Sequence, residues 1–172
     1  MLPDGIRIQR NKSLLTIYQV KESLRKSRLE IRSKPQSFFY SVSGPVDHVT
    51  STETGASLTF SEIPVGTGKM DDLSENIALL DLDKLEFPLI LRNIQPGDRF
   101  NPLGVAGTQK IQKYFIDHKI DRIERRQCPV LLSGNAVIWL AGHRIGGHFK
   151  VTPSTRRVLR IEICRPARSE LE

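Results

Sequence analysis

Two short apolar segments separated by a tight-turn sequence constrain the fold of this 172-residue chain more than any other feature. Residues 128–132 and 136–141 are almost entirely apolar, and they flank Ser133-Gly134-Asn135, a combination typical of a hairpin. Further strand-like segments are 6–9, 14–18, 38–42, 57–65, 77–83, 88–92 and 158–163. The chain is therefore predicted to consist mainly of β-strands.

One helix is predicted, over about residues 108–119. Ile111, Tyr114, Phe115 and His118 follow helical spacing and define one side of the helix, and Thr108 is placed to cap the N-terminus. Tyr114 and Phe115, and Trp139 in the second apolar segment, are therefore expected in the core rather than stacked on nucleotide bases. Many strands with one helix predict an α+β fold in which β predominates.

Membrane insertion and secretion are not indicated by the sequence. It contains no apolar run of the roughly 20 residues that span a bilayer. Residues 1–5 lack the basic and apolar regions of a secretory signal. Cys128 and Cys164 are far apart and suggest ordinary thiols of a reducing compartment. The expected location is the cytoplasm.

No catalytic residue and no metal ligand is assigned from the sequence. Residues 65–69 superficially suggest a phosphate loop, but the pattern needs glycine where Ile63 stands and serine or threonine where Met70 stands. A Ser-Gly-Gly-x-Asp-Ser pyrophosphate loop does not occur. The four histidines lack the spacing of metal ligands, and Asp81 with Asp83 is better explained by polarity at a strand end.

Charge is distributed along the chain in three bands. Residues 7–34 hold nine basic and two acidic residues, 47–83 hold one basic and eight acidic, and 86–172 hold fifteen basic and eight acidic. Such a density of lysine and arginine fits a polyanionic partner, with an inert basic surface as the alternative. The candidate residues for nucleic-acid contacts are Arg92, Arg99, Lys110, Lys113, Lys119, Arg122, Arg125, Arg126, Arg144, Lys150 and Arg156.

A glycine-containing segment, residues 102–108, precedes the predicted helix. Gly104 and Gly107 allow a compact turn that would direct backbone amides and the helix N-terminus outward. The segment is therefore a candidate seat for a phosphate group.

Several motifs in order, within 91–104, 107–120, 125–132 and 137–145, resemble the C-terminal domain of bacterial tRNA(Ile)-lysidine synthetase. The resemblance spans about residues 89–163 and implies a three-layer β/β/α fold, similar to a domain of the phenylalanyl-tRNA synthetase β subunit. It implies that Asp98 caps or pairs with a neighbouring arginine, and that the motif scaffold consists of Pro102, Gly104, Gly107 and Trp139.

The resemblance also implies a role. The whole enzyme uses ATP and Mg²⁺ to adenylate the wobble cytidine of an isoleucine tRNA with a CAU anticodon, and then joins lysine to it. Its N-terminal domain carries the pyrophosphate loop, and its C-terminal domain is implicated in holding the tRNA near the acceptor stem. This chain is therefore expected to be a fragment without activity or cofactor of its own. Its expected partners are tRNA and the enzyme's catalytic domain, with a homodimer left open.

The expected domain organisation has a boundary between residues 83 and 84. Residues 1–83 form a β-rich segment that follows the family's central helical region, and whether this segment packs on the next domain is left open. Residues 84–166 form the tRNA-binding domain, and 167–172 form a tail. Two alternatives remain: a docking domain that barely touches RNA, and a complete small enzyme.

Overall fold

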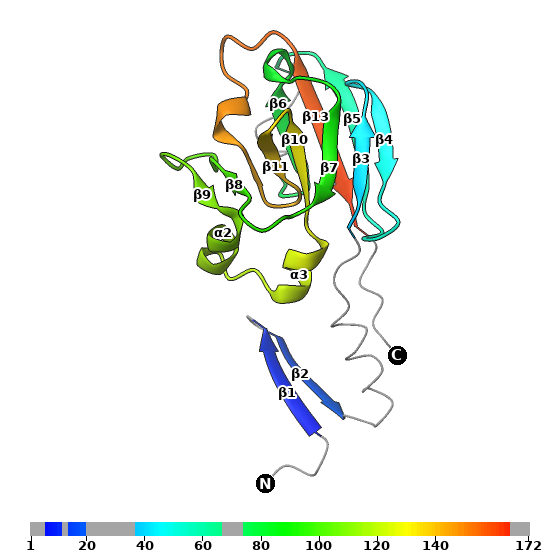
Figure 1. The fold of residues 1–172 in the computed structure, drawn as a ribbon, viewed down its shortest axis with the longest axis vertical. Helices are drawn as coiled ribbons and strands as arrows, with labels where there is room; N and C mark the ends of the chain where they lie inside the picture. The colour runs from blue at the N-terminus through cyan, green and yellow to red at the C-terminus, as the bar shows by residue number, and fades with distance from the viewer. Residues whose placement is uncertain (1–5, 12–13, 20–36, 67–73, 166–172) are drawn as a thin grey trace. The chain divides into compact units, whose positions relative to one another are not determined.

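The computed structural model describes residues 6–11, 14–19, 37–66 and 74–165, and it divides the chain into two units, residues 1–36 and 37–172. In the first unit, β1 (Ile6–Asn11) and β2 (Leu14–Gln19) form an antiparallel pair (Figure 1), which confirms the strands predicted at 6–9 and 14–18. The part of the basic band that spans 20–34 lies outside the described residues.

The second unit is built on two antiparallel sheets. The five-stranded sheet has the order β12-β11-β10-β7-β3, and the four-stranded sheet has the order β4-β5-β13-β6 (Figure 1). The strands are β3 (Phe39–Val42), β4 (Asp47–Thr50), β5 (Ser57–Ile63), β6 (Ile77–Asp81), β7 (Leu89–Asn93), β10 (Pro129–Ser133), β11 (Ala136–Leu140), β12 (Arg144–Ile145) and β13 (Val158–Cys164).

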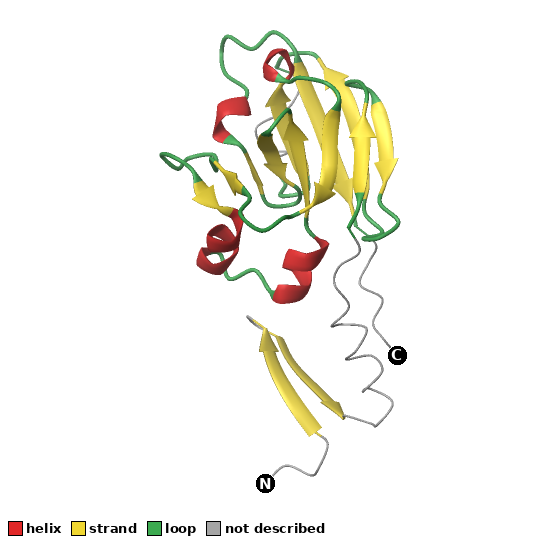
Figure 2. Ribbon diagram, viewed as in Figure 1, coloured by secondary structure: helices red, strands yellow, loops and turns green. Residues whose placement is uncertain are grey.

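Two short α-helices and a small hairpin complete this unit. Figure 2 shows the helical segments, including the 3-10 turns, beside the larger sheets. The hairpin consists of β8 (Arg99–Phe100) and β9 (Gln109–Lys110), and the helices are α2 (Ile111–Asp117) and α3 (Arg122–Gln127). Single 3-10 turns are η2 (Leu82–Lys84) and η3 (Gly147–Phe149).

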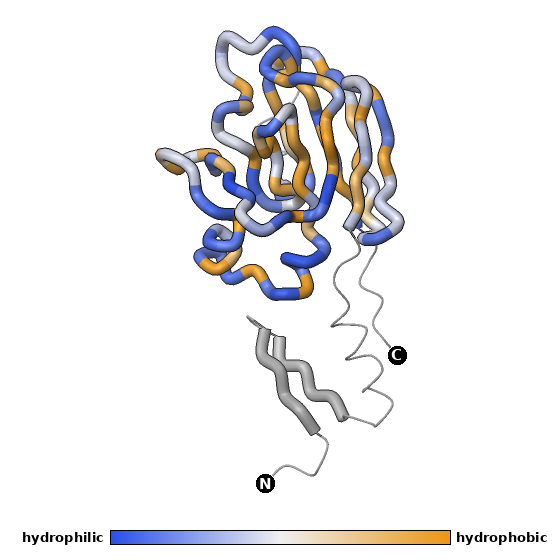
Figure 3. The backbone as a smooth tube through the Cα atoms, in the orientation of Figure 1, coloured by the Kyte–Doolittle hydropathy of each residue, from blue (hydrophilic) through white to orange (hydrophobic). Residues whose placement is uncertain are grey.

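The hydrophobic core has two parts, one on each face of the five-stranded sheet. Between the sheets, Leu131 and Trp139 pack with Phe60 and Leu159 of the four-stranded sheet. On the other face, Val130 and Leu132 pack with α2 and β8 in a second cluster. All five residues of β10 are buried because both faces of this strand are covered, which explains its continuous apolar sequence (Figure 3). The layers are thus sheet, sheet and helix, as predicted.

The structure corrects the predicted helix. It begins at Ile111 rather than 108, because Gln109 and Lys110 pair with β8. The N-cap is Lys110, without a side-chain capping bond, so the predicted cap by Thr108 is wrong.

A second helix, α3, was not predicted. Its side chains are not buried, so the sequence lacks the apolar periodicity that indicates a helix. The signal that could have found it is Asp121, whose carboxylate accepts a hydrogen bond from the Glu124 amide at 2.8 Å as an N-cap.

The N-terminal limit of the larger unit differs from the predicted boundary. Strands β3 to β6 lie before residue 84, yet β3 pairs with β7 and β13 pairs with both β5 and β6. The unit therefore begins at Ser37, and residues 37–83 supply strands to both sheets. In the part of the chain that the structure describes, no helix is both long enough and apolar enough to cross a membrane.

Candidate nucleic-acid interface

Arg92, the first of the candidate residues, lies near the end of β7 and forms a two-pronged ion pair with Asp98. Their nitrogen–oxygen distances are 2.8 and 2.9 Å, and Asp98 also accepts a hydrogen bond from the Gln95 amide at 2.7 Å. Burial opposes ionisation of Asp98, but these hydrogen bonds outweigh it and lower the pKa of the carboxyl group. The expected pairing of Asp98 with an arginine is confirmed, and the Arg92 guanidinium is engaged in it.

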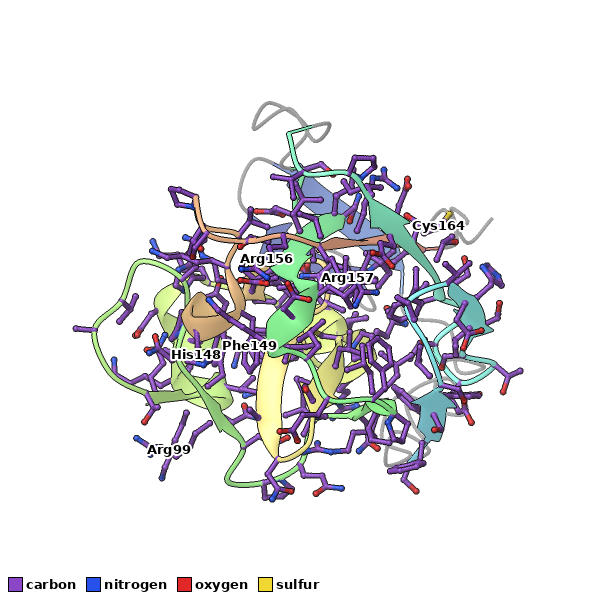
Figure 4. All side chains as sticks on the ribbon, turned by 90° about the horizontal axis from the view of Figure 1, so that it is seen from above. Arg99, His148, Phe149, Arg156, Arg157 and Cys164 are labelled. Atoms are coloured by element: carbon purple, nitrogen blue, oxygen red, sulfur yellow. The ribbon has the colours of Figure 1, made fainter. Side chains whose placement is uncertain are left out.

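The β8–β9 hairpin follows this corner and carries two cations. Arg99 and Lys110 lie directly opposite each other in the register, and both are exposed. Arg99 donates a hydrogen bond to the Thr108 carbonyl at 3.2 Å, and its side chain points away from the body of the unit (Figure 4). The hairpin therefore presents two positive charges side by side to solvent.

The loop of the hairpin, residues 101–108, is anchored to the chain just after β12. Pro102 is buried and forms a bridge with Gly146, and the Leu103 amide donates to the Ile145 carbonyl at 3.0 Å. Gly104 and Gly107 have φ angles of 87° and 79°, a region in which other residues are strained. The expectation that this loop leads directly into the helix is wrong, because β9 intervenes and α2 has only seven residues.

Arg144 of β12 lies near the buried face of α2. Burial raises the pKa of Tyr114, and the positive charge of Arg144 acts against this shift. The Tyr114 ring packs edge-on against the Phe100 ring of β8, with 5.3 Å between the ring centres, and it stacks on the His118 ring, with 3.9 Å between the centres. Arg144 itself is exposed. Tyr114 and Phe100 belong to the second core cluster, which joins α2 to β8.

Two basic residues of the helices have structural partners. Lys113 pairs with Asp117 at 2.8 Å on the exposed side of α2. Arg125 donates to the carbonyl oxygens of Ile120 and Phe115 at 2.7 and 3.4 Å, and its guanidinium lies 5.8 Å from the centre of the Phe115 ring. Both side chains stabilise the helices through these contacts, so binding of a phosphate by Lys113 or Arg125 would have to replace them.

The remaining candidates are exposed. Lys119 lies after α2 with a φ of 54°, whereas Arg122 and Arg126 project from α3. Lys150 and Arg156 lie in the segment between η3 and β13. Figure 4 shows Arg156 beside Arg157 and well apart from Arg99. The eleven predicted residues are therefore not one continuous patch.

Arg157, which is not among the eleven candidate residues, occupies a central position in an ion-pair network. Its guanidinium binds both carboxylate oxygens of Glu62 at 2.8 and 2.9 Å and lies 3.9 Å from Asp83. Its partners are distant in the sequence, and no local signal predicts them.

The paired carboxylates near residue 81 have structural roles. Asp81 is buried and accepts a hydrogen bond from the Thr155 hydroxyl at 2.8 Å, with the Lys84 ammonium 3.5 Å away. The interpretation as strand-end polarity is confirmed. Across the described ranges, no group of three or more His, Cys, Asp or Glu side chains is arranged to hold a metal ion.

Comparison with known proteins identifies relatives for this unit. Residues 89–163 match the family model "TilS substrate C-terminal domain". The tRNA(Ile)-lysidine synthase of Parabacteroides distasonis is 41% identical over 102 residues, which cover 59% of this chain and 23% of that protein. The enzyme of Caldanaerobacter subterraneus is 38% identical over 105 residues, covering 60% and 22%. The chain thus spans about a fifth of the length of these relatives.

Two solved structures share the fold. A crystal structure of a TilS C-terminal domain superposes with a TM-score of 0.65 at 19% identity, covering 77% of this chain and 99% of that one. An N-terminal fragment of the phenylalanyl-tRNA synthetase β-subunit from Pyrococcus horikoshii superposes with a TM-score of 0.51 at 13% identity, covering 92% and 59%. Both confirm the predicted fold class.

Proposed function

We propose that this chain binds tRNA for a lysidine-forming ligase, because residues 89–163 match the TilS substrate C-terminal domain and are similar to the corresponding part of tRNA(Ile)-lysidine synthases. The observation that carries the proposal is the family match together with exposed cations at Arg99, Lys110 and Arg144. Lysine and arginine neutralise phosphates and release counterions, which favours binding of a polyanion.

The proposed substrate is the isoleucine tRNA with a CAU anticodon, held near its acceptor stem. The ligase would use ATP and Mg²⁺ in the cytoplasm to adenylate the wobble cytidine and to join lysine to it. The described residues do not provide a fitting metal site, since their carboxylates are not grouped for one. We therefore assign this chemistry to the N-terminal catalytic domain of the enzyme, which would be the second partner of the unit.

The proposed binding depends on which cations are available. Arg92, Lys113 and Arg125 are engaged with Asp98, Asp117 and backbone carbonyls respectively. The proposal therefore relies mainly on the exposed side chains of Arg99 and Lys110 on the hairpin, together with Arg144 of β12 and Arg122 of α3. This distribution favours contacts with phosphates and the shape of RNA over the stacking of single bases, because Tyr114, Phe115 and Trp139 are buried.

The dependence of tRNA affinity on salt concentration tests this proposal. A plot of the logarithm of the binding constant against that of the salt concentration should have a slope of roughly −0.9 per phosphate contact, as calibrated on duplex DNA. Arg99→Ala and Lys110→Ala should each weaken binding. Binding that is absent or independent of salt would contradict the proposal.

A docking role is the second candidate, and exposed apolar side chains on the helices favour it. Ile116 of α2 and Ile123 of α3 are 63% and 53% exposed. Such side chains are suited to packing against another domain of the same enzyme. A full-length enzyme whose tRNA affinity survives deletion of this unit would support docking over direct RNA binding.

A further inference from the structure

The loop of the β8–β9 hairpin is organised by one side chain, that of Asn101. With its amide nitrogen facing the loop, Asn101 donates to the carbonyl oxygens of Val105 at 2.9 Å and of Pro102 and Gly107 at 3.2 Å. The Asn101 backbone carbonyl accepts a hydrogen bond from the Gly147 amide at 2.8 Å. Three carbonyl groups of the loop therefore point toward Asn101, which is itself held in place by the hydrogen bond from Gly147.

The backbone amides of the same loop are available to a ligand. The amides of Leu103 and Val105 donate within the structure, to Ile145 and Pro102. Within the described ranges, no acceptor receives a hydrogen bond from the amides of Gly104, Ala106, Gly107 and Thr108, all of which are exposed residues. Free amides in a turn whose carbonyls face the other way form a concave site for an anion.

The base of the loop adds two positive charges that oppose each other. Arg99 and Lys110 are directly paired across the strands, and like charges in this position destabilise a hairpin. In the described part of the chain, no carboxylate lies within 4 Å of either side chain to neutralise it. An anion bound between Arg99 and Lys110 would offset this repulsion, which favours anion binding at the base of the loop.

We propose that the β8–β9 hairpin binds a phosphodiester group of RNA through the backbone amides of residues 106–108. Arg99 and Lys110 lie on either side of this site, and Asn101 positions the loop for the contact. The inference rests on the proposed function, because it assumes an RNA partner. Between Gly104 and Gly107 the largest side chain is Val105, so a phosphate can reach the backbone. The hairpin thus combines backbone amides with positive side chains, whereas for the other basic candidates the proposal has only the charge of the side chain.

Lys110→Glu separates binding from stability. It places opposite charges across the hairpin, so the thermal midpoint of the full chain should stay equal or rise. The affinity for an unmodified tRNA(Ile) transcript should nevertheless fall by more than about tenfold, since a contact to a charged group is replaced by repulsion. A variant that is less stable and binds tRNA at full strength would overturn the assignment of Lys110.

A pair of neutralising substitutions controls for net charge. Lys110→Gln and Arg160→Gln each remove one charge, but Arg160 lies on the outer face of β13 and pairs with Glu162. Only Lys110→Gln should reduce the salt slope, by about one unit. Equal slopes for the two variants would show that the hairpin has no specific contact.

The positioning role of Asn101 is tested by the same salt dependence, the slope of the logarithm of the tRNA binding constant against the logarithm of the salt concentration. Asn101→Ala should weaken tRNA binding about tenfold and reduce the slope by about one, because the amides no longer converge on a phosphate. Asn135→Ala, in the β10–β11 turn beside Glu86, is the matched control and should change neither quantity. A role in stability alone would lower the thermal midpoint and leave the slope unchanged.

Gly107→Ala is a second variant that perturbs the loop, and it tests the proposal if Asn101→Ala fails to fold. An added Cβ meets nothing within 4 Å, so the substitution acts only through its positive φ, and Gly66→Ala carries the same strain outside the hairpin. Loss of affinity with Gly107→Ala alone supports the proposal. Salt-dependent binding by the wild-type chain that no hairpin variant alters would overturn the hairpin site and retain the proposed function. No binding by the wild-type chain would overturn both.

Discussion

Single residues in this unit divide into those that hold the structure and those that remain available for binding. The Arg92–Asp98 pair belongs to the first group, because both side chains are about seven-eighths buried, with 13% and 14% exposed. The Lys113–Asp117 pair has an equally short distance of 2.8 Å, but its side chains are 65% and 43% exposed. Solvent screens the exposed pair, so the two pairs should differ in their contribution to stability.

Asp98→Asn is expected to lower the free energy of unfolding by about 2–3 kcal/mol, because it removes hydrogen bonds between charged groups and leaves Arg92 without its partner. Asp117→Asn is the control and should cost less than about 0.5 kcal/mol. Denaturant titrations of both variants measure the difference. Equal losses would contradict the structural role of the Arg92–Asp98 pair.

His143 makes the stability of the unit depend on pH. Its ring is 4% exposed, and Nε2 lacks a hydrogen-bond partner within the described ranges, with Glu124 at 3.6 Å. Burial lowers the pKa of His143 to about 4, assisted by the charges of Arg165 and His118 and opposed by Glu75. The native state therefore keeps this ring neutral at pH values where the unfolded chain binds a proton.

The free energy of unfolding should accordingly fall as the pH drops from about 6.5 toward 4, since the unfolded state gains the proton. At pH 5 the wild-type chain should have lost about 2 kcal/mol relative to pH 7, compared with His143→Gln, which has no group to titrate there. Denaturant unfolding of both proteins at the two pH values tests this. A constant difference between them would refute the assignment.

At the scale of elements, the sequence predicted strands better than helices. Alternation along β5 and β13 and the apolar run in β10 depend on burial against a sheet, and these strands form where they were expected. By contrast, α2 and α3 have seven and six residues, too short to be stable alone, and they depend on tertiary contacts. The sequence therefore misplaced the start of one helix and missed the other.

Arg125 connects the two helices, which leads to a prediction at this scale. Arg125→Lys should lower the free energy of unfolding by about 1–2 kcal/mol, because a lysine cannot bond two carbonyls and lie over Phe115 at once. Arg122→Lys, at an exposed position of α3, should have almost no effect. Chemical denaturation compares them, and a similar loss for both variants would exclude the connecting role.

At the scale of the whole molecule, the bands of charge in the sequence do not persist as separate surfaces. Glu62 and Asp83 of the acidic band pair with Arg157 of the second basic band, 95 residues from Glu62. Asp81 pairs with Lys84 and is buried. Three of the eight acidic residues of this band, in β5, β6 and η2, are thus paired with basic side chains, and the net charge of the chain overstates how many basic residues are available.

The division of the chain into two units predicts that they fold independently. Removal of residues 1–36 should leave the thermal midpoint of the remaining unit unchanged. Removal of residues 1–44 should lower it strongly, because β3 pairs with β7 and because Phe38 and Val42 are buried in the core. Thermal unfolding followed by circular dichroism compares the two truncations. Destabilisation by the shorter truncation would contradict the independence of the units.

By itself, the sequence determined much of the local structure: most of the strand segments, the β10–β11 hairpin and the burial of Tyr114, Phe115 and Trp139. These features depend on residues close together in the chain, where periodicity and turn chemistry are informative. Only the tertiary structure decided that β13 lies between β5 and β6, that β3 pairs with β7, and that Arg157 binds Glu62. The physical reason is that sheet order and the partners of a charged side chain depend on contacts between distant segments, and these form only when the whole core packs.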